Sequence, residues 1–189
     1  MNEYVEVILK ALWFFLPSMV GGIGATIAGG GIPIDLGKNF VDGKRFLGDG
    51  KTYNGLLGGV ILAIIVGIFQ TLAVHYTPVN ETWHFGTGFS AVYTIMVLGF
   101  GSIFGDVLGS FIKRRLGVER GEKFPVMDQY DYVLGTLVVL VVLRWSFFYQ
   151  HYIEGIAWVG LLVLLVQTPI VHRLVNIIGY QIGLKKVPW

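Results

Sequence analysis

Hydrophobic residues fall in five long runs that are separated by short polar segments. The runs cover residues 4–28, 53–76, 88–112, 132–149 and 153–179. Each approaches the roughly 20 apolar residues that a helix needs to cross a bilayer core. The pattern predicts an all-α integral membrane protein with five transmembrane helices in a single domain, residues 1–189. The first run is not expected to be a cleaved signal, because it is too long and acidic Glu3 and Glu6, rather than basic residues, precede it.

Composition supports this interpretation. Hydrophobic residues make up 54% of the chain and charged residues 14%, whereas about a quarter of a soluble domain is charged. The 27 glycines suit a membrane helix bundle, where small residues let backbones approach closely. The absence of cysteine excludes a disulfide framework, a thiolate metal site and a cysteine nucleophile.

The distribution of basic residues predicts an orientation. Four Lys or Arg residues lie in the loop 29–52 and five in the loop 113–131, and the C-terminal tail carries Lys185 and Lys186. The alternate connections, 77–87 and 150–152, contain neither Lys nor Arg. Because loops rich in Lys and Arg stay in the cytoplasm, we predict an external N-terminus, a cytoplasmic C-terminus and two cytoplasmic loops, 29–52 and 113–131.

Acidic and basic residues gather around the end of the third run. Asp106 lies inside the apolar run, and the spacing of Asp106, Ser110 and Lys113 places them on one helix face. Asp128 and Asp131 are three residues apart where the fourth run begins. Carboxylates at membrane depth are costly and usually functional. Because Mg²⁺ prefers a few carboxylates together with substrate phosphates and water, these acids predict a divalent-cation site at the cytoplasmic interface.

A second polar segment, GDGKTYNGLLGG (residues 48–59), precedes the second run. Lys51 and Thr52 fall at a predicted helix N-terminus, where free N–H groups favour anions. The segment is not a Walker P-loop, because Arg45 stands where that motif has its first glycine. A turn followed by glycine-mediated helix packing is the simpler explanation.

Other polar features have simple interpretations. One alternative for the basic run 113–115 is that it only fixes the topology and that the nearby acids are its ion-pair partners. We expect Asp35, Asp42 and Asp49 to be solvated partners of the lysines in their loop. The glycine-rich run 21–33 is expected to pack closely or to end the first helix, with a lipid groove as the alternative. Three histidines fall on the predicted outer side and are expected at the membrane interface: His75, His84 and His151.

Two of these segments together resemble the phosphatidate cytidylyltransferase (CDP-diacylglycerol synthase) family. The stretch GDVLGSFIKRRLGVERGEKFPVMDQYD (residues 105–131) is similar to the family's Gly-Asp, Ser-x-x-Lys-Arg, Pro and Asp-x-x-Asp pattern, and GDGKTYNGLLGG is similar to its Gly-Lys-Thr-aromatic-x-Gly segment. Larger members have a His-Gly-Gly stretch before the acids and an Arg where Gln129 stands here. These departures and the short five-span chain resemble the archaeal branch, the CDP-archaeol synthases.

The resemblance implies a nucleotidyltransferase of the cell membrane with its active site on the cytoplasmic side. It implies CTP and 2,3-bis-O-geranylgeranylglycerol 1-phosphate, an isoprenoid glycerol-ether lipid phosphate, as substrates. The products would be the CDP-activated lipid and pyrophosphate, made for archaeal phospholipid biosynthesis. Asp106, Asp128 and Asp131 would hold Mg²⁺, with Mn²⁺ as the alternative. The residues expected to act with them or to bind the phosphates are Gly50, Lys51, Thr52, Ser110, Lys113, Arg114, Arg115 and Arg120.

Two rival functions stay open at this stage. A CTP-dependent lipid or polyprenol kinase would transfer the γ-phosphoryl group and release CDP. A small transporter would place polar residues along a path across the bilayer, whereas here the second and fourth runs are almost purely apolar. We expect membrane lipids but no nucleic acid among the partners, and a homodimer is compatible with the sequence.

Overall fold

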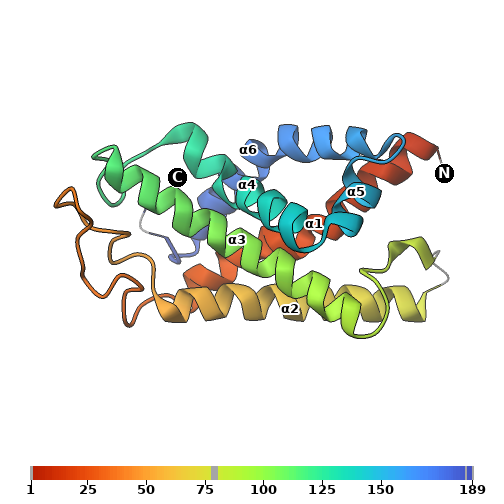
Figure 1. The fold of residues 1–189 in the computed structure, drawn as a ribbon, viewed down its shortest axis with the longest axis horizontal. Helices are drawn as coiled ribbons and strands as arrows, with labels where there is room; N and C mark the ends of the chain where they lie inside the picture. The colour runs from red at the N-terminus through yellow and green to blue at the C-terminus, as the bar shows by residue number, and fades with distance from the viewer. Residues whose placement is uncertain (1, 78–80, 186, 189) are drawn as a thin grey trace.

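A computed structural model describes residues 2–77, 81–185 and 187–188. Lys186 and part of the connection 77–87 therefore lie outside the described residues. The helices are α1 (Glu3–Ile27), α2 (Tyr53–Tyr76), the short 3-10 helix η1 (Glu81–Trp83), α3 (Phe89–Arg115), α4 (Pro125–Leu143), α5 (Trp145–Tyr152) and α6 (Ala157–Gln181). Five of them, α1, α2, α3, α4 and α6, are long and apolar enough to cross a membrane. The prediction of an all-helical chain with five spans is confirmed (Figure 1).

The fourth hydrophobic run is not one helix. It divides at Arg144, whose backbone leaves the helical region with φ −140° and ψ 48°, and α5 follows as a separate helix of eight residues. The fourth helix also begins earlier than the pattern indicates, at Pro125, because proline is well suited to the first turn of a helix. Asp128 and Asp131 consequently lie within α4, and the preceding loop is shortened to 116–124.

Glycines allow the first two helices to pack closely. A Cβ added to Gly58 of α2 would lie 2.2 Å from the Cβ of Ala28 and 2.8 Å from the carbonyl oxygen of Gly24. A Cβ on Gly24 would in turn lie 2.4 Å from the carbonyl oxygen of Gly58. The expected close packing is therefore confirmed at Gly24, and α1 ends within the run 21–33, at Ile27.

A second glycine contact joins α3 to α4. Gly101, Gly105 and Gly109 lie one turn apart on one face of α3, and all are buried. A Cβ on Gly105 would lie 2.0 Å from the carbonyl oxygen of Asp131, and a Cβ on Gly101 would lie 2.7 Å from the Cα of Thr136. This close approach places Asp131 of α4 directly beside the part of α3 that carries Asp106.

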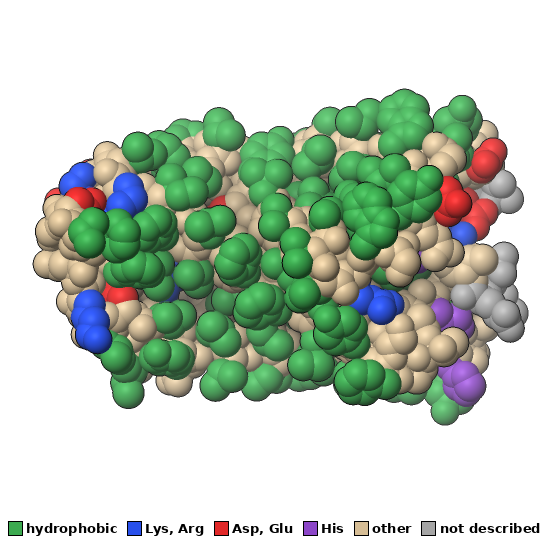
Figure 2. Space-filling view, in the orientation of Figure 1, with side chains coloured by type: hydrophobic (Ala, Val, Ile, Leu, Met, Phe, Trp, Pro, Cys, Tyr) green, Lys and Arg blue, Asp and Glu red, His purple; other side chains and the backbone are tan. Residues whose placement is uncertain are grey.

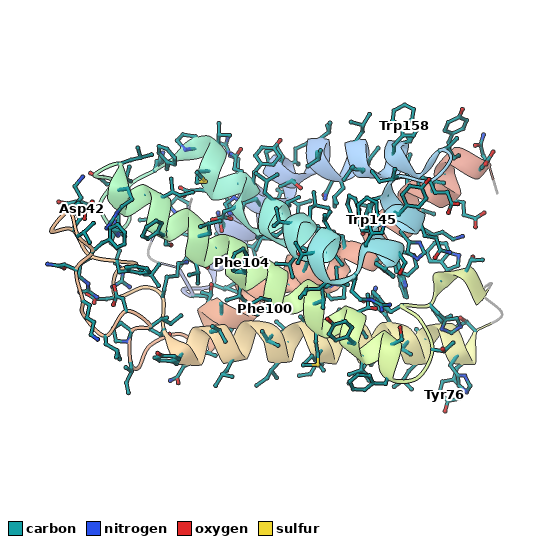
Figure 3. All side chains as sticks on the ribbon, in the orientation of Figure 1. Asp42, Tyr76, Phe100, Phe104, Trp145 and Trp158 are labelled. Carbon is teal, nitrogen blue, oxygen red and sulfur yellow. The ribbon has the colours of Figure 1, made fainter. Side chains whose placement is uncertain are left out.

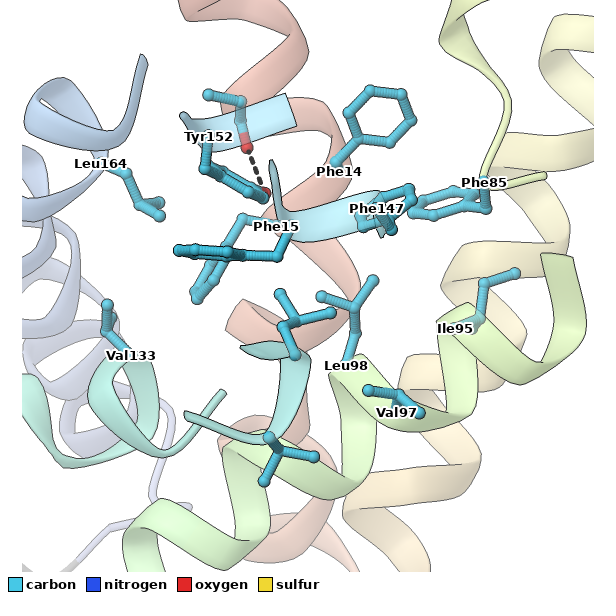
Figure 4. Packing of buried hydrophobic residues seen from close by; sticks show 14 of the residues in the cluster. Phe14, Phe15, Phe85, Ile95, Val97, Leu98, Val133, Phe147, Tyr152 and Leu164 are labelled. Atoms are coloured by element: carbon cyan, nitrogen blue, oxygen red, sulfur yellow. Dashed lines mark hydrogen bonds between the residues drawn. The ribbon is translucent and has the colours of Figure 1, made fainter. Parts of the chain in front are cut away.

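An aromatic core fills the bundle toward the end that holds α5 (Figure 4). Phe14 contacts the rings of Phe85 and Phe147 edge-on, with centroid distances of 5.3 Å in both pairs. The hydroxyl of the fully buried Tyr152 donates a hydrogen bond to the carbonyl oxygen of Ala11, 3.3 Å away. The apolar packing thus lies away from the ion pairs described below.

The surface is that of a multi-pass membrane protein. Hydrophobic side chains cover the middle of the face drawn in Figure 2, and charged side chains gather at the two ends. Phe69, Val142 and Val166 are each at least 70% exposed, which in water would leave large apolar areas uncovered. Trp145, Trp158 and Tyr76 lie toward one end and Asp42 at the other (Figure 3). We call the end with Asp42, the loop 28–52 and the loop 116–124 the basic end.

Candidate active site

The glycine-rich segment meets the third helix at an ion pair. The Nζ of Lys51 lies 2.5 Å from Oδ2 of Asp106, and the two side chains are 22% and 33% exposed. Thr52 is the N-cap of α2, and its hydroxyl accepts a hydrogen bond from the backbone N–H of Gly55 at 3.1 Å. Together with Gly50, these residues line a cavity of about 30 Å³ that is open to solvent. The geometry makes the helix start and Asp106 parts of one site.

A second ion pair joins α3 to α4. The Nζ of Lys113 lies 2.5 Å from Oδ1 of Asp128, and both side chains are partly exposed. The other carboxylate oxygen of Asp128 accepts a hydrogen bond from the backbone N–H of Phe124 at 2.9 Å. An acid in this first turn is stabilised by the N-terminal end of the helix dipole. Asp128 is thus fixed at the start of α4 with its charge facing the end of α3.

Asp131 has a different environment from the other two acids. It is half-buried against α3, where a Cβ on Gly109 would lie 3.0 Å from its Oδ2. Its Oδ1 accepts a hydrogen bond from the backbone N–H of Tyr132 at 2.6 Å. Within the described parts of the chain, no Lys, Arg or His forms a salt bridge with Asp131. Its carboxylate is therefore the one of the three that lacks a direct cationic partner.

The C-terminal tail adds a cation that sequence reasoning assigned only to topology. After α6 the chain turns at Gly183 (φ +78°), and the backbone N–H of Lys185 bonds to the carbonyl oxygen of Gly179 at 3.0 Å. The ammonium of Lys185 donates to the side-chain oxygen of Asn176, which is 2% exposed. The pKa of Lys185 lies below its usual value, mainly because burial disfavours the charged ammonium. The negative charges of Asp106, Asp131 and Asp128 raise this pKa and offset only part of the effect. The sequence offers no local signal for this return of the tail to the acids.

The acids do not form a complete metal site by themselves. Among the described residues, no group of three His, Asp or Glu side chains is placed to hold a metal ion. Asp106 and Asp128 instead face lysines. The donor chemistry still fits Mg²⁺, because that ion is usually held by one or two carboxylates and completed by substrate phosphates and water.

The loop 28–52 is organised by a buried acid, Asp35, contrary to the expectation that Asp35 is solvated, whereas Asp42 and Asp49 remain 35% and 60% exposed. The Asp35 side chain is fully buried and pairs with Arg45 at 2.9 Å. It also accepts hydrogen bonds from the backbone N–H groups of Leu47 at 3.0 Å and Gly48 at 2.8 Å. Burial opposes ionisation, but the hydrogen bonds from Arg45 and the backbone are stronger in sum and hold the pKa of Asp35 well below its usual value.

Arg114 and Arg115 were both predicted to bind substrate. They contact the loop 28–52 instead of the acids of α3 and α4. Arg114 donates from Nε to the carbonyl oxygen of Leu47 at 3.2 Å. Arg115 donates to the carbonyl oxygen of Arg45 and pairs with Asp42 at 3.0 Å. Its guanidinium carbon also lies 4.8 Å from the centre of the Phe40 ring and 5.0 Å from that of Phe111. Both arginines therefore attach the loop to the end of α3.

The last two predicted residues differ in their surroundings. Arg120 is exposed beside Gly50, where a Cβ on the glycine would lie 3.6 Å from its Nε. Ser110 is half-buried on α3, one turn beyond Asp106 toward the basic end. The structure therefore brings Gly50, Lys51, Thr52, Asp106 and Arg120 to one side of the basic end. Lys113, Asp128 and Asp131 lie at the α3–α4 contact.

Comparisons with known proteins agree with this arrangement. The model of the CarS-like family, CDP-archaeol synthase, matches residues 4–189. The chain belongs to this family. It is 38% identical over 186 residues to the CDP-archaeol synthase of Methanocaldococcus jannaschii, covering 98% of this chain and 99% of that one. It is 41% identical over 180 residues to the CDP-archaeol synthase of Methanopyrus kandleri, covering 95% and 92%.

A solved structure supports the same assignment of the chain to the CDP-archaeol synthase family. It is described as an intramembrane enzyme for archaeal membrane lipids biosynthesis. Its TM-score to this chain is 0.60 at 35% identity, and the match covers 84% of this chain and 92% of that one. The family model, which matches residues 4–189, includes both the segment 48–59 and the segment 105–131.

Proposed function

We propose that the chain is a CTP-dependent cytidylyltransferase that converts 2,3-bis-O-geranylgeranylglycerol 1-phosphate to its CDP-activated form and releases pyrophosphate. The observation that carries this proposal is the meeting of two distant segments in one cluster. Lys51 reaches Asp106 across 55 positions of sequence, and Lys113 reaches Asp128. A site with three carboxylates and several primary ammonium groups at the membrane surface suits a polyphosphate and a second phosphate.

The reaction needs no covalent intermediate with the protein. An oxygen of the lipid phosphate attacks the α-phosphorus of CTP, and the bond from that phosphorus to the oxygen bridging to the β-phosphate breaks. The electron pair leaves with pyrophosphate. Because the attacking oxygen belongs to a phosphate that is already anionic near neutral pH, a general base is not required. The protein must hold the two substrates in line and neutralise their charges.

The roles of the residues follow from their present partners. Asp106, Asp128 and Asp131 would hold Mg²⁺ together with the substrate phosphates. When bound, Mg²⁺ would neutralise the triphosphate and polarise the reacting phosphorus. Lys51 and Lys113, now paired with Asp106 and Asp128, would transfer their hydrogen bonds to phosphate oxygens.

Further cations surround these two lysines. Lys185 and Arg120 stand at the edge of the same cluster and would bind the outer phosphates of CTP. Gly50 and Thr52 would place the start of α2 against the phosphates of CTP. Ser110, on α3, would contribute its hydroxyl to phosphate binding. We assign Arg114 and Arg115 to holding the loop 28–52 beside the site, because each donates a hydrogen bond to a backbone carbonyl oxygen of that loop.

The proposed topology places the basic end in the cytoplasm. Both basic loops and the C-terminal end of the chain lie at this end of the bundle (Figure 1), as the charge distribution of membrane proteins requires of cytoplasmic segments. CTP would then reach the site from the cytoplasm. The lipid phosphate would enter sideways, since its hydrocarbon chains can remain beside the exposed apolar faces of the helices.

The test is transfer of label from CTP to lipid. Purified protein is incubated in detergent with Mg²⁺, geranylgeranylated glyceryl phosphate and CTP labelled with ³²P in the α-position, and in parallel with CTP labelled in the γ-position. We expect the α-label in the extracted lipid and the γ-label in pyrophosphate. A γ-labelled lipid together with released CDP would show a lipid kinase and overturn the proposal.

A further inference from the structure

A large cavity lies at the opposite end of the bundle from the acid cluster. It has a volume of about 790 Å³ and lies between the last turns of α2, the first turns of α3, α5 and the segment 82–88. This volume is within the range of small-molecule sites, and nothing in the proposed reaction uses it. Histidine and basic side chains are visible at this end of the molecule in Figure 2.

One arginine gives the cavity its charge. Arg144 lies between α4 and α5 and is one of the residues that line the cavity. Its Nη2 donates to the Ser90 hydroxyl at 2.9 Å, and its guanidinium carbon lies 5.7 Å from the centre of the Tyr93 ring. The Nε is buried without a hydrogen-bond partner, and no carboxylate of the described residues forms a salt bridge with this side chain.

Arg144 is half-buried, with its Nε buried, so part of its charge is removed from water at a cost. Buried charges normally have a counter-ion, and removing the partner of a buried ion leaves a large desolvation penalty. Intramembrane arginines accordingly pair with another group or mark a ligand site. In the part of the chain that the structure describes, Arg144 has a hydroxyl and an aromatic ring as neighbours but no carboxylate in an ion pair with it. The chemistry that would complete it is an anion with oxygen acceptors.

Apolar side chains from α2 and α3 line another part of the cavity, beside the polar Thr71 and His75. Ile68 and Leu72 of α2 and Val92 of α3 line it and are 45%, 48% and 41% exposed. These helices are candidate membrane spans, so the wall continues into the apolar surface of the bundle. A free inorganic anion would gain nothing from this wall, whereas a hydrocarbon chain would bury apolar area on it.

We propose that this cavity binds a membrane phospholipid, with its phosphate on Arg144 and one chain along Ile68, Leu72 and Val92. The occupant would be an anionic lipid, because Arg144 supplies a full positive charge and none of the described residues that line the cavity is an acid. In the proposed topology this is a lipid of the outer leaflet. The site is separate from the cytidylyltransferase centre and does not depend on that assignment.

Native mass spectrometry of the delipidated full-length protein tests the proposal. Dioleoylphosphatidylglycerol is titrated into the detergent-solubilised protein, with dioleoylphosphatidylcholine as the zwitterionic lipid of equal chain length. We expect saturable binding of one phosphatidylglycerol with clear preference over phosphatidylcholine. Arg144→Gln should weaken this binding about tenfold, the effect of one charge-assisted hydrogen-bond pair, and Arg144→Lys should retain most of it.

Two further variants separate the site from general effects. Lys10→Gln removes a cation of α1 that is already paired with Glu6 at 2.7 Å and does not line the cavity, so binding should be unchanged. Leu72→Trp fills the apolar wall without touching Arg144 and should weaken binding, which also keeps the test available if Arg144→Gln fails to fold. Unchanged phosphatidylglycerol binding in Leu72→Trp or in a folded Arg144→Gln variant would overturn the proposal. So would displacement of the lipid by millimolar inorganic phosphate, which would indicate a site for the free anion.

Discussion

Two groups of cations lie within the same basic end but have different partners. Arg45, Arg114 and Arg115 donate to backbone carbonyl oxygens or to the buried Asp35, and they hold the loop 28–52 in place. Lys51 and Lys113 each face one helix carboxylate at 2.5 Å and remain about one-fifth exposed. The sequence presents both groups as equal parts of a basic cluster. Their contacts divide them into cations of the scaffold and cations available to a ligand.

The energetic consequences of the two arrangements differ. A lysine that exchanges its carboxylate partner for a phosphate oxygen keeps an anionic partner, so the exchange does not leave its charge unpaired. A guanidinium whose donors satisfy buried carbonyl groups is harder to displace, because each acceptor left unsatisfied costs about 1–3 kcal/mol. Lysines in open pairs therefore suit substrate binding, and arginines on the backbone suit the scaffold.

The largest loss of activity is expected when an acid of the proposed site is removed. We predict that Asp128→Asn lowers the transfer rate by at least about 100-fold, the effect of losing one group that stabilises transition-state charge, and leaves a folded membrane protein. The assay is transfer of α-label to lipid, with size-exclusion chromatography as the test of folding. Asp42→Asn, which removes an acid of the loop, is the matched control and should retain most of the activity. Full activity of the purified Asp128→Asn protein would exclude Asp128 from the site.

Helix packing gives the next largest effect. Gly105→Ala places a methyl group 2.0 Å from the carbonyl oxygen of Asp131, so α4 must move away from α3. Overpacking of this kind costs about 1–3 kcal/mol, and it displaces two of the three acids. We predict a lower Tm together with a loss of activity. Gly22→Ala of α1 is the control, since no heavy atom lies within 4 Å of an added Cβ. Equal behaviour of the two variants would contradict a requirement for close α3–α4 contact.

The C-terminal tail should produce a smaller and more selective change. We predict that Lys185→Met raises the KM for CTP by about five- to tenfold, within the range of a hydrogen bond to a charged group, with a smaller effect on kcat. Lys185→Arg should restore most of the affinity, because a cation is kept. Steady-state kinetics with CTP varied at saturating lipid give both values. An unchanged KM in Lys185→Met would restrict the tail to a structural role.

The scaffold group predicts a pH effect on stability. The pKa of Asp35 is held below its usual value, so the folded state favours the ionised form. This stabilisation is complete above the ordinary carboxyl pKa of about 3.9 and is lost as the pH falls through the lower folded value. Asp35→Asn should therefore lower the Tm at neutral pH and differ less from the wild type as the pH falls below 4. A constant difference across that range would contradict the role of the Asp35 charge.

Much of the fold was predictable because its signals are local. The number of spans follows from apolar run length, and the N-cap role of Thr52 follows from its place before an apolar run. The break at Arg144 was not predictable, because the apolar run continues through it and the local sequence contains neither Gly nor Pro. The burial of Asp35 and the return of Lys185 depend on tertiary contacts, which residue spacing does not encode. The family motif pointed to two segments that the structure places in contact, but it could not separate the contacts of Arg115 from those of Lys113.

The most direct test of the division between scaffold and site compares Lys51→Met with Arg115→Met. Equilibrium CTP binding in the presence of Mg²⁺ and the Tm without nucleotide are measured for both purified proteins. We predict that Lys51→Met weakens CTP binding about tenfold or more with little change in Tm. Arg115→Met should lower the Tm by several degrees, as expected for the loss of about 1–2 kcal/mol in a chain of this size, while the folded protein binds CTP normally. Normal CTP binding by Lys51→Met, or its loss in a stable Arg115→Met protein, would contradict the division.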